Sequence, residues 1–289
     1  MQIVTDSGVD LRFPPEQMAE WNVHIVPLTV TLGGRSYREG VDIQPDEFYK
    51  LLAATDELPT TSQPSVGDFV QVYERLAATD PDILSIHMSS GLSGTLSSAQ
   101  AAAQLVPEAR VTHVDTKTLS AASGWQVAAA ARALQASWPL ERILALIARV
   151  GAAADSLYTL NDLTYLIHGG RISHLKGLIA SVLRIKPVIG VEKEGGTYEQ
   201  MGQARAFQGA VKKIADLIAR QHAPDSALRM QVLHSHNPEG AQILRDLLDK
   251  RFDCHWLPMG TISLVLGAHT GPSMVGVAFA PAAAFEGIP

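Results

Sequence analysis

The chain has 289 residues, of which 46% are hydrophobic and 18% charged, and its formal net charge is -6. This length and apolar content suffice for one large domain or two medium ones. The negative charge, together with the lack of a stretch that concentrates Lys and Arg with aromatic residues, argues against a nucleic-acid partner.

The sequence also argues against a secreted or membrane-spanning protein. Its single cysteine, Cys254, cannot form an intrachain disulfide, and no Cys/His spacing resembles a structural zinc site. The first residues carry an acid at Asp6 and no basic region before an apolar core, unlike a secretory signal. The longest apolar stretch, 139–160, is broken by Arg142, Arg149 and Asp155. We therefore expect a cytoplasmic protein.

The first half of the chain alternates strand and helix patterns. We expect strands at Ile3-Val4, Val23 to Leu32, Asp82 to Met88 and Arg110 to Val114, and helices from Pro14, near Pro45, near Pro64-Ser65, over Thr95 to Leu105 and over Ser123 to Ala136. Gly33-Gly34 reads as a hairpin turn. This alternation is typical of βαβ units in a mostly parallel, Rossmann-like sheet.

A second α/β unit is predicted beyond the helix over Pro139 to Val150, with the domain boundary between residues 152 and 153. We expect helices between Asn161 and Gly169, from Ser173 along the stripe Leu175 to Leu183, over Phe207 to Gln221 and over Pro238 to Lys250, with strands Val188 to Val191, Met230 to Leu233 and Val275 to Ala280. The fold class is thus α/β, with an N-terminal domain 1–152 and a smaller α/β sandwich 153–289.

Three turns rich in hydroxyls follow predicted strands or precede predicted helices. They read Thr5-Asp6-Ser7, Pro59-Thr60-Thr61-Ser62-Gln63-Pro64-Ser65 and Ser89-Ser90-Gly91-Leu92-Ser93-Gly94-Thr95. In a parallel sheet, ligands bind where strands end and helices begin, and the helix N-terminus favours an anion. The simpler alternatives are that these side chains cap helices and that Asp6 accepts from backbone amides.

Two further segments place a basic side chain beside glycines. Arg171 follows Gly169-Gly170, and His269 lies in what reads as a tight turn from Gly267 to Pro272. A third segment, His234-Ser235-His236, has too few nearby ligands to indicate a metal site.

Known catalytic and nucleotide motifs match poorly. Gly91-Leu92-Ser93-Gly94-Thr95 resembles a nucleophile elbow but has Thr95 where the last glycine belongs. A serine hydrolase acting on acyl esters through Ser93 and His269, with Asp6 as third member, is therefore the alternative hypothesis. The chain has neither a P-loop nor a dinucleotide-binding fingerprint.

The motifs in this order resemble the DegV family of bacterial fatty-acid-binding proteins. They are the three hydroxyl-rich turns, Gly169-Gly170-Arg171-Ile172, Ile185-Lys186-Pro187 and Gly267-Ala268-His269-Thr270-Gly271-Pro272. The resemblance spans about Ile3 to Phe279 and implies two α/β domains with a long-chain fatty acid between them. One departure is Ser273, where family members usually have a glycine after the proline.

The resemblance also implies the residues of the site. Thr61 and Ser93 would donate to the carboxylate, Ser62, Gly94 and Thr270 would line the head-group site, and Arg171 and His269 would lie close by. It implies a carrier without catalytic residues, metal or cofactor, which presents its fatty acid to a separate ATP-dependent fatty acid kinase and meets the membrane only transiently.

Simple energetics support this interpretation of the hydroxyls. A carboxylate removed from water needs several hydrogen bonds to offset its desolvation. A buried tail of about 15 carbons, at roughly 0.8 kcal/mol per methylene, contributes on the order of 12 kcal/mol before the cost of association. On this interpretation the tail sets most of the affinity, and Ser93 donates a hydrogen bond rather than attacking.

Overall fold

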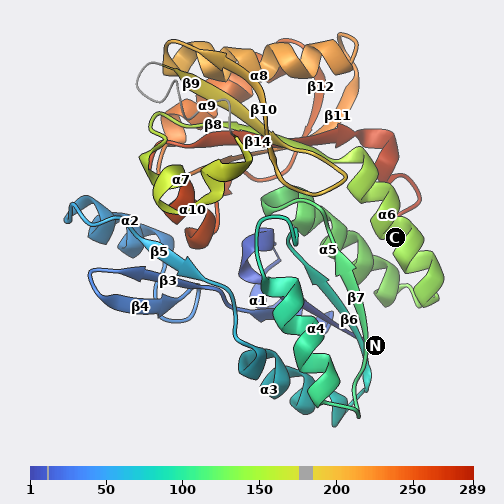
Figure 1. Ribbon diagram of the computed structural model, residues 1–289. Coiled ribbons are helices and arrows are strands. Elements are labelled where there is room, and N and C mark those ends of the chain that lie inside the picture. Colours follow the sequence, from blue (N-terminus) through green and yellow to red (C-terminus); the bar gives the residue numbers. More distant parts are fainter. Residues whose placement is uncertain (12, 176–184) are drawn as a thin grey trace.

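The computed structural model describes residues 1–11, 13–175 and 185–289. These residues form three sheets, two of which are stacked one above the other with helices around them (Figure 1). The predicted stripe from Leu178 to Leu183 lies outside the described residues. Ser173, which we expected to cap that helix, lies in the short 3-10 helix η2 (Arg171–His174) and donates to the Gly170 carbonyl.

The first sheet has the strand order β2-β1-β6-β7 among the described residues, and every pairing is parallel. Its strands are β1 (Gln2–Asp6), β6 (Asp82–His87), β7 (Arg110–Asp115) and β2 (Val23–Val26). Two helices, α3 (Val66–Ala77) and α4 (Thr95–Leu105), bury aromatic and alanine side chains against one face. The opposite face packs with α5 (Ser120–Gln135), and α6 (Leu140–Ala153) packs on α5.

A small antiparallel sheet, β4-β3-β5, projects from this unit (Figure 1). It consists of β3 (Thr29–Leu32), β4 (Arg35–Arg38) and β5 (Thr60–Ser62), and α2 (Pro45–Ala53) packs on it. The expected single strand from Val23 to Leu32 is wrong, because β2 and β3 belong to different sheets. Pro27, which lacks an amide hydrogen, separates them. The hairpin at Gly33-Gly34 is confirmed, since Leu32 pairs with Arg35.

The second sheet is mixed, in the order β10-β9-β8-β14-β11-β12, with β13 beside β11. Its strands are β8 (Asp155–Thr159), β9 (Lys186–Val191), β10 (Tyr198–Ala204), β11 (Ala227–His234), β12 (Asp253–Trp256), β13 (Gly260–Thr261) and β14 (Val275–Pro281). The amphipathic helices α8 (Phe207–Gln221) and α9 (Pro238–Asp249) cover its outer face (Figure 1).

Two short helices lie between the second sheet and the small sheet (Figure 1). They are α7 (Thr164–His168) and α10 (Leu264–Thr270). The prediction of a tight turn beginning at Gly267 is wrong in its first part. Residues 267–270 are the last residues of α10, and the chain turns only at Gly271, whose φ is 70°. The shorter helices α1 (Pro15–Glu20), η1 (Ser7–Val9) and η4 (Ala282–Phe285) complete the described elements.

The α/β class with a parallel first sheet is confirmed. The two large sheets separate in sequence between α6 and β8, and the domain boundary after residue 152 stays a prediction. A common hydrophobic cluster joins them, with Leu84 and Trp125 from the first unit and Leu160 and Leu233 from the second. Within the described ranges, no helix is long and apolar enough to cross a membrane.

Candidate functional site

Strand β5 and the turn after β6 meet α10 at one cavity of about 310 Å³. Polar side chains from several parts of the chain line it together with apolar ones: Leu28, Thr61, Ser62, Gln63, Met88, Leu92, Ser93, Arg171, Tyr198, Val265, Leu266 and His269. Five of the seven residues that we expected at the site therefore share its wall. The other two, Gly94 and Thr270, lie nearby in different settings. We call this space the head-group cavity.

A direct contact joins the first and last of these segments. The Thr61 hydroxyl is hydrogen-bonded to Nε2 of His269 at 2.8 Å, although 208 positions separate them in the chain. Thr61 reaches this position because it lies in β5, which pairs with β3 in the small sheet. The sequence suggested an ordinary helix entry here. That holds only for Ser65, whose side chain caps α3 in a capping box with Asp68.

His269 is neutral in this environment. Its side chain is buried, and burial lowers the pKa of the imidazole to about 4, with further lowering by Arg171 and His168. The other ring nitrogen, Nδ1, is buried without a partner in the described part of the chain. The imidazole is therefore uncharged at neutral pH, and Arg171 is the cation among the described residues that line the head-group cavity.

Gly169 allows the His269 ring to lie where it does. A Cβ at Gly169 would stand 2.0 Å from Nδ1 of His269, which is far inside any real contact distance. The carbonyl of the same glycine accepts a hydrogen bond of 2.6 Å from Nη1 of Arg171. Gly169 thus helps to position both basic side chains. This explains the glycine better than turn geometry does, because its φ of -70° is open to any residue.

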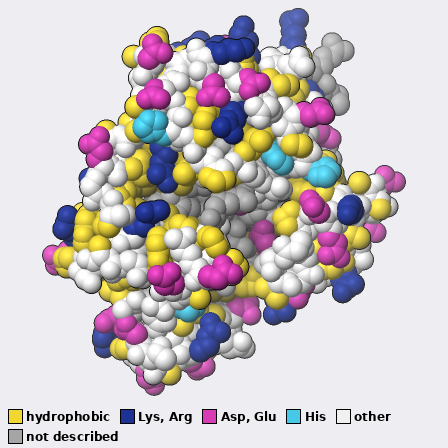
Figure 2. Space-filling model, turned by 180° about the vertical axis from the view of Figure 1, so that it is seen from behind, with side chains coloured by type: hydrophobic (Ala, Val, Ile, Leu, Met, Phe, Trp, Pro, Cys, Tyr) yellow, Lys and Arg dark blue, Asp and Glu magenta, His cyan; other side chains and the backbone are white. Residues whose placement is uncertain are grey.

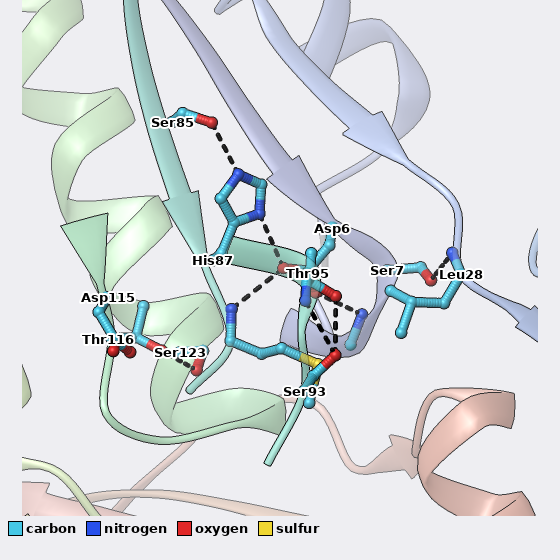
Figure 3. Close-up of polar contacts among 12 residues, drawn as sticks. Asp6, Ser7, Leu28, Ser85, His87, Ser93, Thr95, Asp115, Thr116 and Ser123 are labelled. Carbon is cyan, nitrogen blue, oxygen red and sulfur yellow. Dashed lines mark hydrogen bonds and ion pairs between the residues drawn. The ribbon is translucent and has the colours of Figure 1, made fainter. Parts of the chain in front are cut away.

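The Ser93 hydroxyl is hydrogen-bonded to the Thr95 hydroxyl at 2.8 Å (Figure 3). Gly94, between them, is the N-cap of α4, and a Cβ there would collide with the Gln63 side chain. Gly94 therefore lets the second and third hydroxyl turns approach each other. Thr270 differs from the expected arrangement, since its hydroxyl donates to the Leu266 carbonyl and its side chain lines a second cavity.

The second cavity is smaller, with a volume of about 40 Å³, and its lining is mostly apolar. Tyr198 and Leu266 line both cavities, so the two cavities adjoin at these side chains. Its further walls come from β8, β11, α10 and β14. We call it the tail cavity. The sequence did not predict it, because its residues come from strands that meet only in the folded sheet.

Asp6 belongs to a buried network instead of a triad with His269. Its carboxylate accepts from the amides of Gly8 and Met88 and lies 2.9 Å from Nδ1 of His87, as Figure 3 shows. Nε2 of His87 is bonded to the Ser85 hydroxyl at 2.7 Å. The expected acceptance from backbone amides is confirmed. His87 was not predicted to take part, because it lies within an apolar strand.

The Ser93–His269–Asp6 triad is thus not assembled in this structure. Ser93 is bonded to Thr95, His269 to Thr61 and Asp6 to His87. The chain Ser85–His87–Asp6 has the residue types of a triad, but all three side chains are completely buried. A substrate could not reach that serine, so its role is structural.

The glycine hairpin between β9 and β10 closes over the Ser89 turn. Ser89 donates from its hydroxyl to the Gly196 carbonyl at 2.8 Å. A Cβ at Gly91 would lie 2.4 Å from the Gly195 carbonyl. The second sheet therefore contacts the hydroxyl-rich turn directly, which fixes that turn beside the head-group cavity.

On the opposite side, Glu39 holds the beginning of α10. Its carboxylate accepts from the hydroxyls of Ser7 and Ser263 at 2.8 and 3.0 Å, and also from the Leu264 amide. Burial, with a smaller contribution from Asp10, raises the pKa of Glu39 to about 7. A cavity of about 450 Å³ lies beside it. Figure 2, from behind, shows that the surface is hollowed at its centre, with an acidic side chain in the hollow.

The segment His234-Ser235-His236, considered above as a metal site, makes other contacts. Ser235 donates to the Gly271 carbonyl, and the His236 ring stacks on Tyr49 at 5.1 Å between centroids. Among the described residues, no group of three His, Cys, Asp or Glu side chains could hold a metal ion.

The structure is thus an α/β protein with two adjoining cavities, one lined by hydroxyls and an arginine and the other mostly apolar. The model of the DegV family, described as uncharacterised, matches residues 1–282. The chain belongs to the DegV family.

Relatives and solved structures agree with this assignment. The chain is 32% identical over 277 residues to a DegV domain-containing protein of Listeria innocua, covering 95% of this chain and 96% of the relative. It is 34% identical over 281 residues to one of Deinococcus radiodurans, covering 97% and 96%.

Among solved structures, a fatty-acid-binding DegV family protein from Thermus thermophilus has a TM-score of 0.85 at 31% identity, covering 97% of this chain and 99% of that one. DegV of Bacillus subtilis, described as a fatty acid binding protein, has a TM-score of 0.84 at 28% identity, covering 97% and 98%.

Proposed function

We propose that this protein binds a long-chain fatty acid, with the carboxylate in the head-group cavity and the acyl chain directed toward the tail cavity, which at about 40 Å³ must widen to take a long chain. The observation that carries the proposal is that two cavities of different character adjoin at Tyr198 and Leu266. One cavity is lined by hydroxyls and a guanidinium, and the other is mostly apolar. A fatty acid has the same division along its length.

Thr61 and Ser93 are the proposed carboxylate donors, with Arg171 as the countercharge. Each of the two hydroxyls has only a neutral partner in the structure, His269 or Thr95, and can turn its hydrogen toward an anion. Hydrogen bonds to a charged acceptor are stronger than those between neutral groups, so a carboxylate competes well for these donors. Ser62 and Gly94 shape the turns around this site, and Thr270 its border with the tail cavity.

The fatty acid kinase is the proposed partner. The protein would act as a carrier in the cytoplasm, presenting the acid to a separate ATP-dependent kinase and exchanging lipid by transient membrane contact. Supporting this role, Arg171 is partly exposed at the head-group cavity, where its charge suits the more highly charged acyl phosphate as well as the acid.

Mass spectrometry tests the proposal. Native spectra of freshly purified protein should show a mass excess that denaturation removes, and the released compound should be a long-chain fatty acid. Protein that carries no lipid and gains none on incubation with long-chain acids would contradict it. A fluorophosphonate probe tests the hydrolase alternative, which requires stoichiometric labelling of Ser93, and we expect none.

A further inference from the structure

A small cavity lies where the first and second units of the chain meet, and it shares no lining residue with the head-group or tail cavity. Its volume is about 190 Å³. Arg132 enters its wall from α5 in the first unit, and Arg229 from β11 in the second. The remaining lining residues are Trp125, Ala128, Ala129, Phe285, Ile288 and Pro289. We call this space the arginine cavity.

The two arginines of this cavity have no acidic partner. Other arginines of the chain form ion pairs with aspartates, namely Arg38, Arg110, Arg245 and Arg251. In the described ranges, no carboxylate of Asp or Glu is paired with Arg132 or Arg229, and they are the charged side chains of the cavity wall. Nη1 of Arg132 donates to the backbone carbonyl of Pro289 over a long distance of 3.4 Å. Two positive charges thus share one small space.

Arg229 is partly buried, which makes its charge costly. Its guanidinium lies over the rings of Phe285 and Trp125, with 4.4 and 5.4 Å from Cζ to the two ring centroids. A ring face attracts a cation but accepts hydrogen bonds poorly. Nε is covered and has no partner among the described residues, so the two Nη atoms are the donors that can reach a ligand. Burial lowers the pKa of Arg229, and the charge of Arg132 lowers it further.

An anion in the arginine cavity would relieve this repulsion. Guanidinium groups present a planar set of donors that matches the oxygen atoms of phosphate, and two of them can bind one phosphate from different sides. A phosphate group carries nearly two negative charges at pH 7, whereas a carboxylate carries one. One water molecule needs about 10–15 Å³ of such space, so a phosphate group fits.

We propose that the arginine cavity binds a phosphate group, either inorganic phosphate or the phosphate of a small phosphorylated molecule, through Arg132 and Arg229. Since one arginine belongs to each unit, the bound group also bridges α5 and β11. The inference does not depend on fatty-acid binding, because the cavity has its own lining residues.

Isothermal titration at low ionic strength and pH 8 tests the proposal, with inorganic phosphate, glycerol 3-phosphate and acetate as the ligands. Wild-type protein should bind at least one of the two phosphates, and about tenfold or more tightly than acetate. The tighter of the two tells whether the site takes free phosphate or a phosphate ester. Arg132→Gln should weaken this binding about tenfold or more, because it removes a charged donor. Arg132 is exposed, so this variant should fold as wild type does.

Arg229→Gln is the second variant and should cause a similar loss. Arg142→Gln is the matched control, because Arg142 is an exposed arginine of α6 that stacks on Trp138 and does not line the cavity. It should leave phosphate binding unchanged. All three variants should keep the fatty-acid affinity of wild type, so that a failure of this inference is distinct from a failure of the proposed function.

Three results would overturn the inference. The first is an absence of phosphate binding by wild type, which a carboxylate on Pro289 filling the cavity would also produce. The second is acetate binding as tight as phosphate binding. The third is phosphate binding that persists in the variants of Arg132 and Arg229 but is lost in Arg171→Ala, since the phosphate would then occupy the head-group cavity.

Discussion

Thr61 and His269 are bonded side chain to side chain at 2.8 Å across 208 positions of sequence. One comes from the edge of the small antiparallel sheet and the other from α10, which leads into the second sheet. The contact closes the head-group cavity between the two halves of the chain. It also leaves a neutral imidazole bonded to the hydroxyl that we propose as a carboxylate donor.

Replacing Thr61 with alanine should weaken fatty-acid binding by about 10- to 100-fold. The reason is that a hydrogen bond to a charged group contributes about 1.5–3 kcal/mol. Isothermal titration of delipidated protein measures the change. Thr60→Ala is the control, because Thr60 is exposed and does not line the head-group cavity, and it should have a much smaller effect. Equal losses in both variants would argue against Thr61 as a direct donor.

Gly169→Ala should lower the affinity for fatty acid without a large decrease in the stability of the protein to thermal unfolding. The added Cβ would stand 2.0 Å from Nδ1 of His269, so the ring must leave its position beside Thr61. Gly67→Ala is a suitable control, because a Cβ there meets only the Ser65 hydroxyl, at 3.6 Å. Affinity and thermal unfolding, measured on both variants, check the prediction. Unchanged affinity in the Gly169 variant would show that the ring position is unimportant.

Arg171→Ala should impair kinase-dependent formation of acyl phosphate more than it impairs fatty-acid binding. The guanidinium is the cation of the head-group cavity at neutral pH, and its attraction grows with the charge of the ligand. Affinity for the acid and the rate of acyl phosphate formation with a fatty acid kinase and ATP give the two quantities. Arg171→Lys keeps the charge and should recover part of the rate. Equal loss of binding and rate would refute this division.

Protonation of His269 should make the protein less stable in mild acid. The folded pKa is about 4 and the ordinary value is 6.5, so the unfolded chain takes up a proton first as the pH falls. The contribution is complete above pH 6.5 and is lost as the pH falls toward 4, by about 3 kcal/mol in total. Urea unfolding across this range should show a smaller loss in His269→Gln. Parallel curves for the two proteins would exclude the effect.

Glu39 should produce the opposite pH dependence. Its pKa is about 7 in the folded protein, above the ordinary 4.5, so the folded chain holds the proton more tightly between these values. Its contribution to stability is present below pH 4.5 and is lost as the pH rises through 7. Glu39→Gln should therefore gain stability relative to wild type between pH 5 and pH 8, whereas the exposed Glu57→Gln should not. A constant difference across that range would contradict the raised pKa.

Sequence reasoning succeeded where the signal was local. Alternating strand and helix patterns predicted the parallel sheet, because each pattern reports the burial of its own segment. The hydroxyl-rich turns could be found from their composition, and Thr61, Ser62 and Ser93 all line the head-group cavity. The prediction of a single strand from Val23 to Leu32 failed because the alternation of apolar and polar residues continues through Pro27. Only the strand pairing shows that the two halves join different sheets.

The class of the fold could be predicted from the sequence alone, because periodicity is a property of neighbouring residues, and turn composition led us to the residues of the proposed carboxylate site. The low pKa of His269, the close fit of its ring against Gly169 and the position of Tyr198 between a polar and an apolar cavity depend instead on the folded structure. The physical reason is that a pKa and a cavity depend on what surrounds a group in space. Those surroundings come from strands and helices that are far apart in the chain.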